Sequence, residues 1–150
     1  KYTNEKALQT VYDVLESTGR KVVIMKKCAP GFIGNRLQHA LYREAVNMVE
    51  QGIATPEDID KTLMYSFVPR YTSIGIFEHF DYAGLDMIVS IDDYLFPDLS
   101  NAAKTQDFIR SKYEAGNLGQ KTGQGVYDWS KVDMEDFRMR AAKPYLAFFN

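Results

Sequence analysis

The sequence predicts an all-α fold of six or seven helices, with one short strand near the N-terminus. Apolar residues recur every three or four positions through most of the chain, which is the spacing of one helix face. Threonine or proline stands where several of these stretches begin, and glycine where several end. One continuous apolar run, Val-Val-Ile-Met at 22–25, is typical of a strand buried on both faces. With 45% hydrophobic residues in 150, the chain can form the core of about one domain.

The N-terminal segment is expected to contain one helix and the strand. The helix should span 4–18, with Thr3 as its N-cap and Gly19 just after its end. No second segment offers the strand at 22–25 a convincing partner, so its sheet is expected to come from sequence outside this chain. Cys28, at the strand end, is interpreted as a small buried residue.

The strongest helical pattern is an apolar stripe over 32–49 that stops near Gly52. A second helix should cover 55–65, because the Thr55 hydroxyl can cap it and Pro56 suits its first position. The stretch that follows, up to about residue 75, lacks periodicity, and the glycine-rich segment near residue 120 is expected to be a loop. Further helices are expected at 77–83, 85–95 and 104–115, and a last one runs from Met134 through Ala141 until Pro144 interrupts it.

Charge and composition exclude several classes of partner. Eighteen basic and 20 acidic residues give a net charge of -2, so there is no overall positive field and nucleic acid is not expected to bind. No apolar run approaches the roughly 20 residues that span a bilayer, so no membrane partner is expected. With a single cysteine, no internal disulfide can form, and a reducing, cytoplasmic compartment is expected.

The titratable residues form no recognisable catalytic or metal motif. His39 and His79 lie in no nucleophile or zinc pattern, so neither is expected to be catalytic, and His39 is interpreted as a solvated or hydrogen-bonded histidine on a helix. The carboxylates at 57–60 and 92–93 are interpreted as helix-start or surface groups. No metal is expected to bind.

Two polar residues stand in settings that favour binding. Asn35 lies in the first turns of an apolar helix beside Gly31 and Gly34, which remove side chains and let another group approach. Its amide can donate and accept, and so could position a carbonyl or a histidine; a helix cap or packing amide is an equal alternative. Lys121 lies in a glycine-rich loop that lacks Walker spacing, and it could reach a cofactor phosphate, although a surface turn is the default interpretation.

Several motifs occur together in the order and spacing of a known family. Over residues 17–129 the chain resembles the L-3-hydroxyacyl-CoA dehydrogenases, from the junction of their two domains through the C-terminal domain. The motifs are TGRKVV at 18–23, APGFIGNRL at 29–37, EA at 44–45, EQG at 50–52, ATPEDID at 54–60, GIFE at 75–78, DYAGLD at 81–86 and GQKTGQGVY at 119–127.

The resemblance implies a two-domain enzyme that oxidises the 3-hydroxyl of an acyl-CoA to a ketone by hydride transfer to NAD. Residues 1–27 would be the last helix and strand of an NAD-binding Rossmann domain. Residues 28–150 would be a helical domain, of the type also found at the C-terminus of 6-phosphogluconate dehydrogenase, that closes the active site and forms a homodimer. The family's catalytic His and Glu and its glycine-rich nucleotide motif have no counterpart here, so the fragment alone is expected to be inactive.

Site residues carry over by motif. Asn35 matches an asparagine that orients the catalytic histidine and the substrate's C3 oxygen, and Lys121 matches a lysine that contacts NAD. At 70–78 the chain reads RYTSIGIFE where the acyl-CoA enzymes carry GYPMGPFE, and Arg70 followed by Tyr71 is similar to relatives that oxidise small free 3-hydroxy acids, such as gulonate or carnitine.

Arg70 therefore leaves the substrate open between an acyl-CoA and a free acid. Its guanidinium can hold a carboxylate through two parallel hydrogen bonds, whereas a thioester carries no such charge; a solvated loop cation is the alternative. A third interpretation is a purely structural helical dimerisation module.

Overall fold

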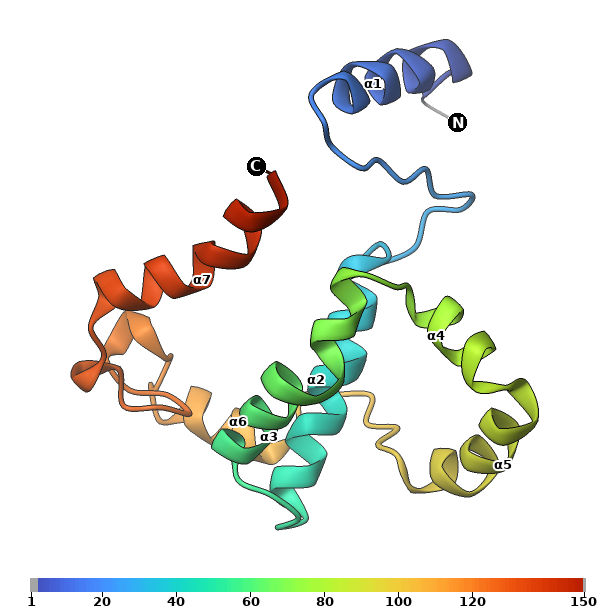
Figure 1. The fold of residues 1–150 in the computed structure, drawn as a ribbon. Coiled ribbons are helices and arrows are strands. Elements are labelled where there is room, and N and C mark those ends of the chain that lie inside the picture. Colours follow the sequence, from blue (N-terminus) through green and yellow to red (C-terminus); the bar gives the residue numbers. More distant parts are fainter. Residues whose placement is uncertain (1–2, 150) are drawn as a thin grey trace. The chain divides into compact units, whose positions relative to one another are not determined.

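The computed structural model describes residues 3–149 of the chain. These residues fall into two compact units, which are described separately: one unit contains the residues up to 32 and from 131 onward, and the other contains residues 33–130. Each of the seven helices that the sequence predicts is present as an α-helix in one or the other unit (Figure 1). Within residues 3–149 no strand is formed, so the all-α prediction is confirmed.

The larger unit is built around α2 (Gly34–Glu50), which contacts both α3 (Pro56–Thr62) and α6 (Asp107–Glu114) (Figure 1). The core of this group is small. Val46 of α2 is 4% exposed and Ile59 of α3 is 9% exposed, and they are the buried apolar residues of the part of the chain that the structure describes. Of the apolar stripe predicted over 32–49, the part from Leu41 to Val49 faces the two neighbouring helices, whereas Leu37 is 59% exposed.

The start of α3 follows the prediction closely. Thr55 is the N-cap: its hydroxyl accepts a hydrogen bond from the Asp58 amide at 3.2 Å and donates one to the Asp58 carboxylate at 2.8 Å. Beyond Thr62 the chain stays helical through a π turn, η1 (Leu63–Phe67), and a 3-10 turn, η2 (Val68–Thr72). Both turns depart from 3.6 residues per turn, which explains why the sequence shows no helical period there.

Two carboxylates of α2 hold distant segments against this helix. Glu44 accepts a hydrogen bond from the Ser100 amide at 2.6 Å, and Glu50 accepts one from the Phe108 amide at 2.7 Å. Phe108 lies in the first turn of α6, where amide groups lack partners within the helix and a negative charge is favourable. The two glutamates therefore stabilise the contact of α2 with the chain that leads into α6.

The helices α4 (Ile76–Ala83) and α5 (Leu85–Leu95) pack chiefly on each other, and α5 is followed by the 3-10 turn η3 (Phe96–Asp98). Gly84 separates the two helices with a φ of 100°, a value that favours glycine. The predicted division at this glycine is confirmed. In Figure 1 this pair stands apart from α2, α3 and α6, and we call it the α4–α5 arm.

The segment after α6 is a compact loop, with short 3-10 turns η4 (Gln120–Thr122) and η5 (Trp129–Lys131). The Gly119 amide donates to the Gln124 carbonyl at 2.8 Å. Gly125 is buried beneath Gly119: a Cβ on Gly125 would lie 2.6 Å from the Gly119 Cα. This close approach requires glycine at position 125.

The smaller unit contains α1 (Glu5–Ser17) and α7 (Met134–Phe149). Asn4, not Thr3 as predicted, is the N-cap of α1, since its side chain accepts a hydrogen bond from the Ala7 amide at 2.8 Å. The prediction that Pro144 interrupts the last helix is also wrong. A proline ring holds φ near a helical value, so the chain loses one hydrogen bond and the helix continues.

The strand expected at 22–25 is not formed in this chain, where Val23 is 71% exposed. A strand exists only when its backbone pairs with a neighbour, and none of the described residues pairs with this segment. Cys28 is exposed, so its interpretation as a buried residue is wrong for the same reason. No helix within residues 3–149 has both the length and the apolar character needed to cross a membrane.

Candidate functional site

Asn35 is the second residue of α2, and its side chain is exposed. Ile33 is the N-cap of this helix and makes no side-chain capping bond. Within the described residues nothing is hydrogen-bonded to the Asn35 amide, so the alternative of a local cap does not hold. A Cβ at the neighbouring Gly34 would meet nothing within 4 Å. The start of α2 thus presents an amide in open space.

Arg70 and Tyr71 both lie in η2. The guanidinium Nη1 of Arg70 lies 2.6 Å from Nε2 of His79, which belongs to α4. The Tyr71 ring meets Phe67 edge to face, with 6.2 Å between ring centroids. No motif in the sequence joins Arg70 to His79, although their spacing of nine residues across a short loop is a signal that they can meet.

Lys121 occupies the middle of η4, and its side chain is exposed. Gly119 and Gly123 flank the turn, with φ values of 80° and 76°. The Thr122 side chain stabilises the turn through two hydrogen bonds. Its hydroxyl accepts one from the Leu118 amide at 2.9 Å and donates one to the Gln124 carbonyl at 3.1 Å. Lys121 therefore lies on a turn that is stabilised by hydrogen bonds.

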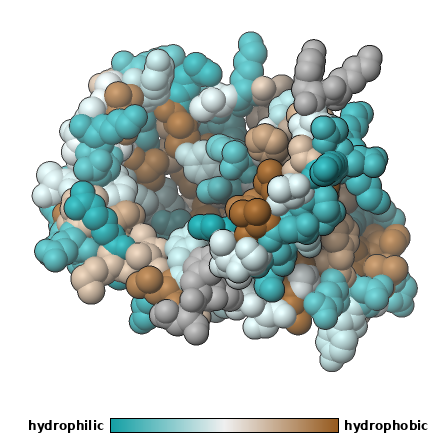
Figure 2. All heavy atoms as spheres, turned by 90° about the horizontal axis from the view of Figure 1, so that it is seen from above, coloured by the Kyte–Doolittle hydropathy of each residue, from teal (hydrophilic) through white to brown (hydrophobic). Residues whose placement is uncertain are grey.

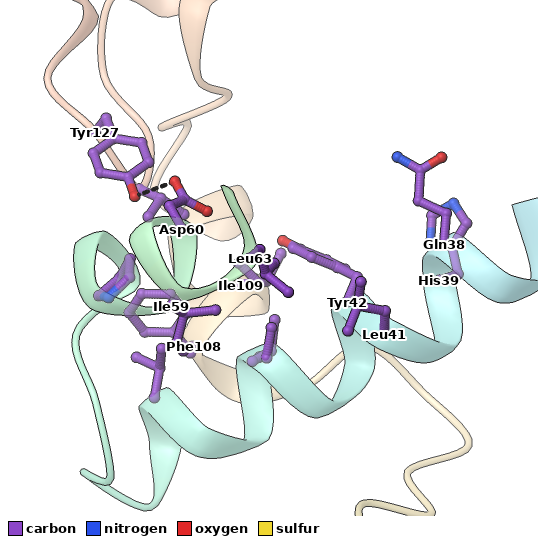
Figure 3. A pocket seen from close by; sticks show the side chains of 15 residues that line it. Gln38, His39, Leu41, Tyr42, Ile59, Asp60, Leu63, Phe108, Ile109 and Tyr127 are labelled. Carbon is purple, nitrogen blue, oxygen red and sulfur yellow. Dashed lines mark hydrogen bonds between the residues drawn. The ribbon is translucent and has the colours of Figure 1, made fainter. Parts of the chain in front are cut away.

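A tyrosine ties the same loop to α3. The Tyr127 hydroxyl donates a hydrogen bond to the Asp60 carboxylate at 2.7 Å (Figure 3). Burial, this hydrogen bond and the negative charges of Asp60 and Glu57 together raise the pKa of Tyr127 above its usual value. From the sequence, Asp60 is interpreted only as a helix-start carboxylate. Its partner is 67 residues away, so no local pattern indicates the contact.

A groove of about 500 Å³ runs between α2, α3 and α6. Figure 3 shows Tyr127 and Asp60 at one end of it and Gln38 and His39 at the other. Between these ends its walls are apolar, with Tyr42, Ile59 and Phe108 among them. Burial raises the pKa of Tyr42 above its usual value.

The candidate residues lie on separate elements of the larger unit: Asn35 on α2, Arg70 and Tyr71 on η2, and Lys121 on η4. Among residues 33–130 no hydrogen bond joins Asn35, Arg70 and Lys121 to one another. The arrangement supplies a neutral amide and two exposed cations, which suit polar and anionic groups of a ligand. In the described part of the chain, no three His, Cys, Asp or Glu residues are grouped so that they could hold a metal ion.

The comparisons with known proteins identify the family. The family model of the 3-hydroxyacyl-CoA dehydrogenase C-terminal domain matches residues 31–129. The chain belongs to this family. The match contains the larger unit almost entirely, and with it Asn35, Arg70 and Lys121.

Individual relatives in the 3-hydroxyacyl-CoA dehydrogenase family are varied. A 5-formyl-3-hydroxy-2-methylpyridine 4-carboxylate 5-dehydrogenase of Mesorhizobium japonicum is 32% identical over 145 residues, which are 97% of this chain and 47% of the relative. An L-carnitine dehydrogenase of Pseudomonas syringae is 37% identical over 84 residues, 56% of this chain and 26% of the relative. The chain thus spans at most about half the length of these two relatives.

A solved structure has the same fold. The crystal structure of a 5-formyl-3-hydroxy-2-methylpyridine 4-carboxylic acid 5-dehydrogenase, described as an NAD+-dependent dismutase, is 32% identical. It matches 99% of this chain with a TM-score of 0.86, over 47% of its own length. Family members related to this chain therefore include an NAD+-dependent enzyme.

Proposed function

We propose that the whole protein is an NAD-dependent dehydrogenase that oxidises a 3-hydroxyl group to a ketone, and that it works in the cytoplasm. This chain would be the helical part that closes over the substrate, with residues 1–27 as the last helix and strand of a Rossmann domain. When bound, NAD would supply the acceptor for the hydride that leaves C3 of the substrate. The hydroxyl proton passes to a general base, which in this family is a histidine without a counterpart in this chain. The chain alone is therefore inactive in this proposal.

Two residues of this chain would serve that reaction. The exposed Asn35 amide at the start of α2 would hold the substrate's C3 oxygen or orient the catalytic histidine, a positioning role without proton transfer. Lys121 would contact an anionic group of NAD. The residues present fit this contact, because the ordered turn η4 carries the ammonium group at the protein surface.

For the substrate, we propose a small 3-hydroxy acid with a free carboxylate, bound by Arg70 with Tyr71 beside it. The observation that carries this choice is the contact of Arg70 with His79 at 2.6 Å, because it orients a guanidinium that no described carboxylate neutralises. The two curated relatives named above support the carboxylate, since one is named for a pyridine carboxylate and the other for carnitine, and the second also supports a small hydroxy acid. An acyl-CoA, for which the matched family is named, is the second candidate.

We further propose that the protein is a homodimer formed through its helical part. The α4–α5 arm supports this proposal, because Phe77 is 89% exposed and Tyr82 is 92% exposed there. In the view of Figure 2, hydrophobic residues are scattered over the surface among hydrophilic ones. Large apolar side chains that no part of their own chain covers are typical of interfaces.

The decisive experiment uses the whole protein with NAD and follows the formation of NADH. The substrates are 3-hydroxybutyrate, carnitine and 3-hydroxybutyryl-CoA. Oxidation of a free acid with a kcat/KM at least tenfold above that of the CoA ester supports the proposal. Preference for the CoA ester supports the second candidate. If the protein oxidises none of these substrates and does not bind NAD, the result supports the interpretation as a structural helical module.

A further inference from the structure

The contact between Arg70 and His79 has only one chemically sensible arrangement of protons. An arginine side chain has five N–H donors and no acceptor. The 2.6 Å contact therefore requires that Nη1 of Arg70 donates and that Nε2 of His79 accepts. A ring nitrogen that accepts a hydrogen bond does so through its lone pair and carries no proton. His79 thus acts as a fixed acceptor beside a permanent positive charge.

The backbone between the two residues keeps them at this separation. The Ser73 and Ile74 amides both donate to the Arg70 carbonyl at 3.0 Å. The His79 amide donates to the Gly75 carbonyl at 2.9 Å in the first turn of α4. The contact is therefore built from one short, internally bonded segment of the larger unit.

The nearby acid does not compete for the arginine. The Glu78 carboxylate accepts a hydrogen bond from the Gly75 amide at 3.2 Å, so it caps α4. Within the described residues no carboxylate pairs with Arg70, whose side chain is exposed. One of its five N–H groups is used by His79, and the others can form the planar fork that fits a carboxylate with two parallel bonds.

The His79 ring is itself held in place. It is half-buried and meets the Phe80 ring edge to face, with 5.4 Å between ring centroids. A long arginine side chain in water loses rotational freedom when it binds a ligand, and this cost lowers affinity. A fixed acceptor that already orients the guanidinium removes part of that cost.

We propose that His79 is a positioning residue that orients Arg70 to bind the free carboxylate of the substrate. This inference rests on the proposed function, and it makes the residue at position 79 a determinant of substrate class. Replacing His79 with a residue that cannot accept a hydrogen bond keeps the charge of Arg70, but the guanidinium is no longer held in one orientation. The loss should therefore appear in KM for a carboxylate substrate, with kcat little changed.

The test uses the whole protein and three substrates that share one reacting end. They are 3-hydroxybutyrate, which carries a carboxylate, 3-hydroxybutyryl-CoA, which carries phosphates, and the 3-hydroxybutyryl thioester of N-acetylcysteamine, which carries no charge. The variants are His79→Phe, which keeps a ring without an acceptor, His79→Gln, which keeps an acceptor, and Arg70→Lys, which keeps the charge without the fork. Arg110→Lys, on the exposed face of α6, is the matched control.

For His79→Phe we expect KM for 3-hydroxybutyrate to rise roughly tenfold, with kcat within about twofold and the neutral thioester unaffected. Arg70→Lys should raise the same KM at least as much, and His79→Gln should restore most of the affinity. An equal loss for all three substrates would mean a folding role and overturn the inference. A loss confined to the CoA ester would mean that the pair binds phosphate, which also overturns it.

A binding measurement keeps the inference testable if none of the three is oxidised. In protein labelled with 15N, the ring nitrogens of His79 are assigned by their disappearance in His79→Gln. Titration with 3-hydroxybutyrate should shift these signals in the unmodified protein and not in Arg70→Ala. Absence of a shift in the unmodified protein overturns the inference. A shift in a protein without dehydrogenase activity supports the pair as a carboxylate site while the proposed reaction fails.

Discussion

The group of α2, α3 and α6 and the α4–α5 arm belong to the same unit, yet they are stabilised in opposite ways. The three-helix group holds the two buried apolar residues, Val46 and Ile59, and is crossed by hydrogen bonds between residues more than 50 positions apart. The arm has large apolar side chains that are almost fully exposed, and its two helices pack chiefly on each other.

This difference in stabilisation indicates which contacts each region makes within the chain and which it lacks. Glu44, Glu50 and Asp60 reach from α2 and α3 to backbone or hydroxyl groups of distant segments of the same chain, so hydrogen bonds within the chain hold the three-helix group together. The arm offers apolar area without such links, and area that stays in water contributes nothing to stability. Its apolar residues gain their stabilisation only when another surface covers them.

The largest expected effect concerns the arm. The double substitution Phe77→Asp and Tyr82→Asp should convert the whole protein from dimer to monomer at tens of micromolar, because it places charges where apolar contacts form. Light scattering measures the mass. Tyr113→Asp, at a residue of α6 that is 68% exposed, is the control and should leave the mass unchanged. A dimer that survives the double substitution would show that the arm is not the interface.

A smaller effect is expected in the three-helix group. Ile59→Ala should lower the free energy of unfolding by about 2–4 kcal/mol, since it leaves a cavity under α2. Urea denaturation of the whole protein provides the value, and Leu37→Ala, at an α2 residue that is 59% exposed, serves as the matched control with a loss of about 1 kcal/mol or less. Equal losses for the two variants would contradict the assignment of the core.

The smallest effect concerns the tie between the loop and α3. Tyr127→Phe should cost about 1 kcal/mol at neutral pH, the usual value of one hydrogen bond. Because the folded state raises the pKa of Tyr127, the stability that this group contributes is complete below pH 10 and falls above it, where the unfolded tyrosine ionises first.

The pH dependence separates this tie from the other groups. Between pH 9 and pH 11 the unmodified protein should lose more stability than the Phe variant, so the difference between them should shrink. Denaturation curves at several pH values measure it. A difference that stays constant with pH would mean that the Tyr127 hydroxyl is not what holds the loop.

The regular helices could be predicted from the sequence, because the residues that indicate a helix and its ends lie within or next to that helix. The helix α2 carries its apolar stripe, α3 begins at a Thr-Pro start signal, and Gly84 divides α4 from α5. The helical course of the chain beyond Thr62 was not predictable from periodicity, because π and 3-10 turns change the spacing of the apolar positions. The predicted interruption at Pro144 was wrong because the loss of one backbone hydrogen bond does not end a helix, and α7 continues past this residue.

The site was predictable only in part. Motifs point to Asn35, Arg70 and Lys121, and the structure shows each of them exposed. The partners that orient or anchor the site were not visible in the sequence. His79 meets Arg70 across a turn that the sequence leaves irregular, and Asp60 meets Tyr127 only after the chain has folded back over 67 residues.

The packing of Gly125 beneath Gly119 has a consequence for how freely this loop can change. Glycine-rich segments are often regarded as flexible tethers, but here the absence of a side chain allows two backbone segments to touch. In a complete substitution library, position 125 should accept glycine alone, whereas Gly34, where a Cβ meets nothing, should accept alanine. Gly125 therefore fixes the backbone of this loop at its contact with Gly119, and in such a library substitutions around Lys121 should be tolerated only at positions outside that contact.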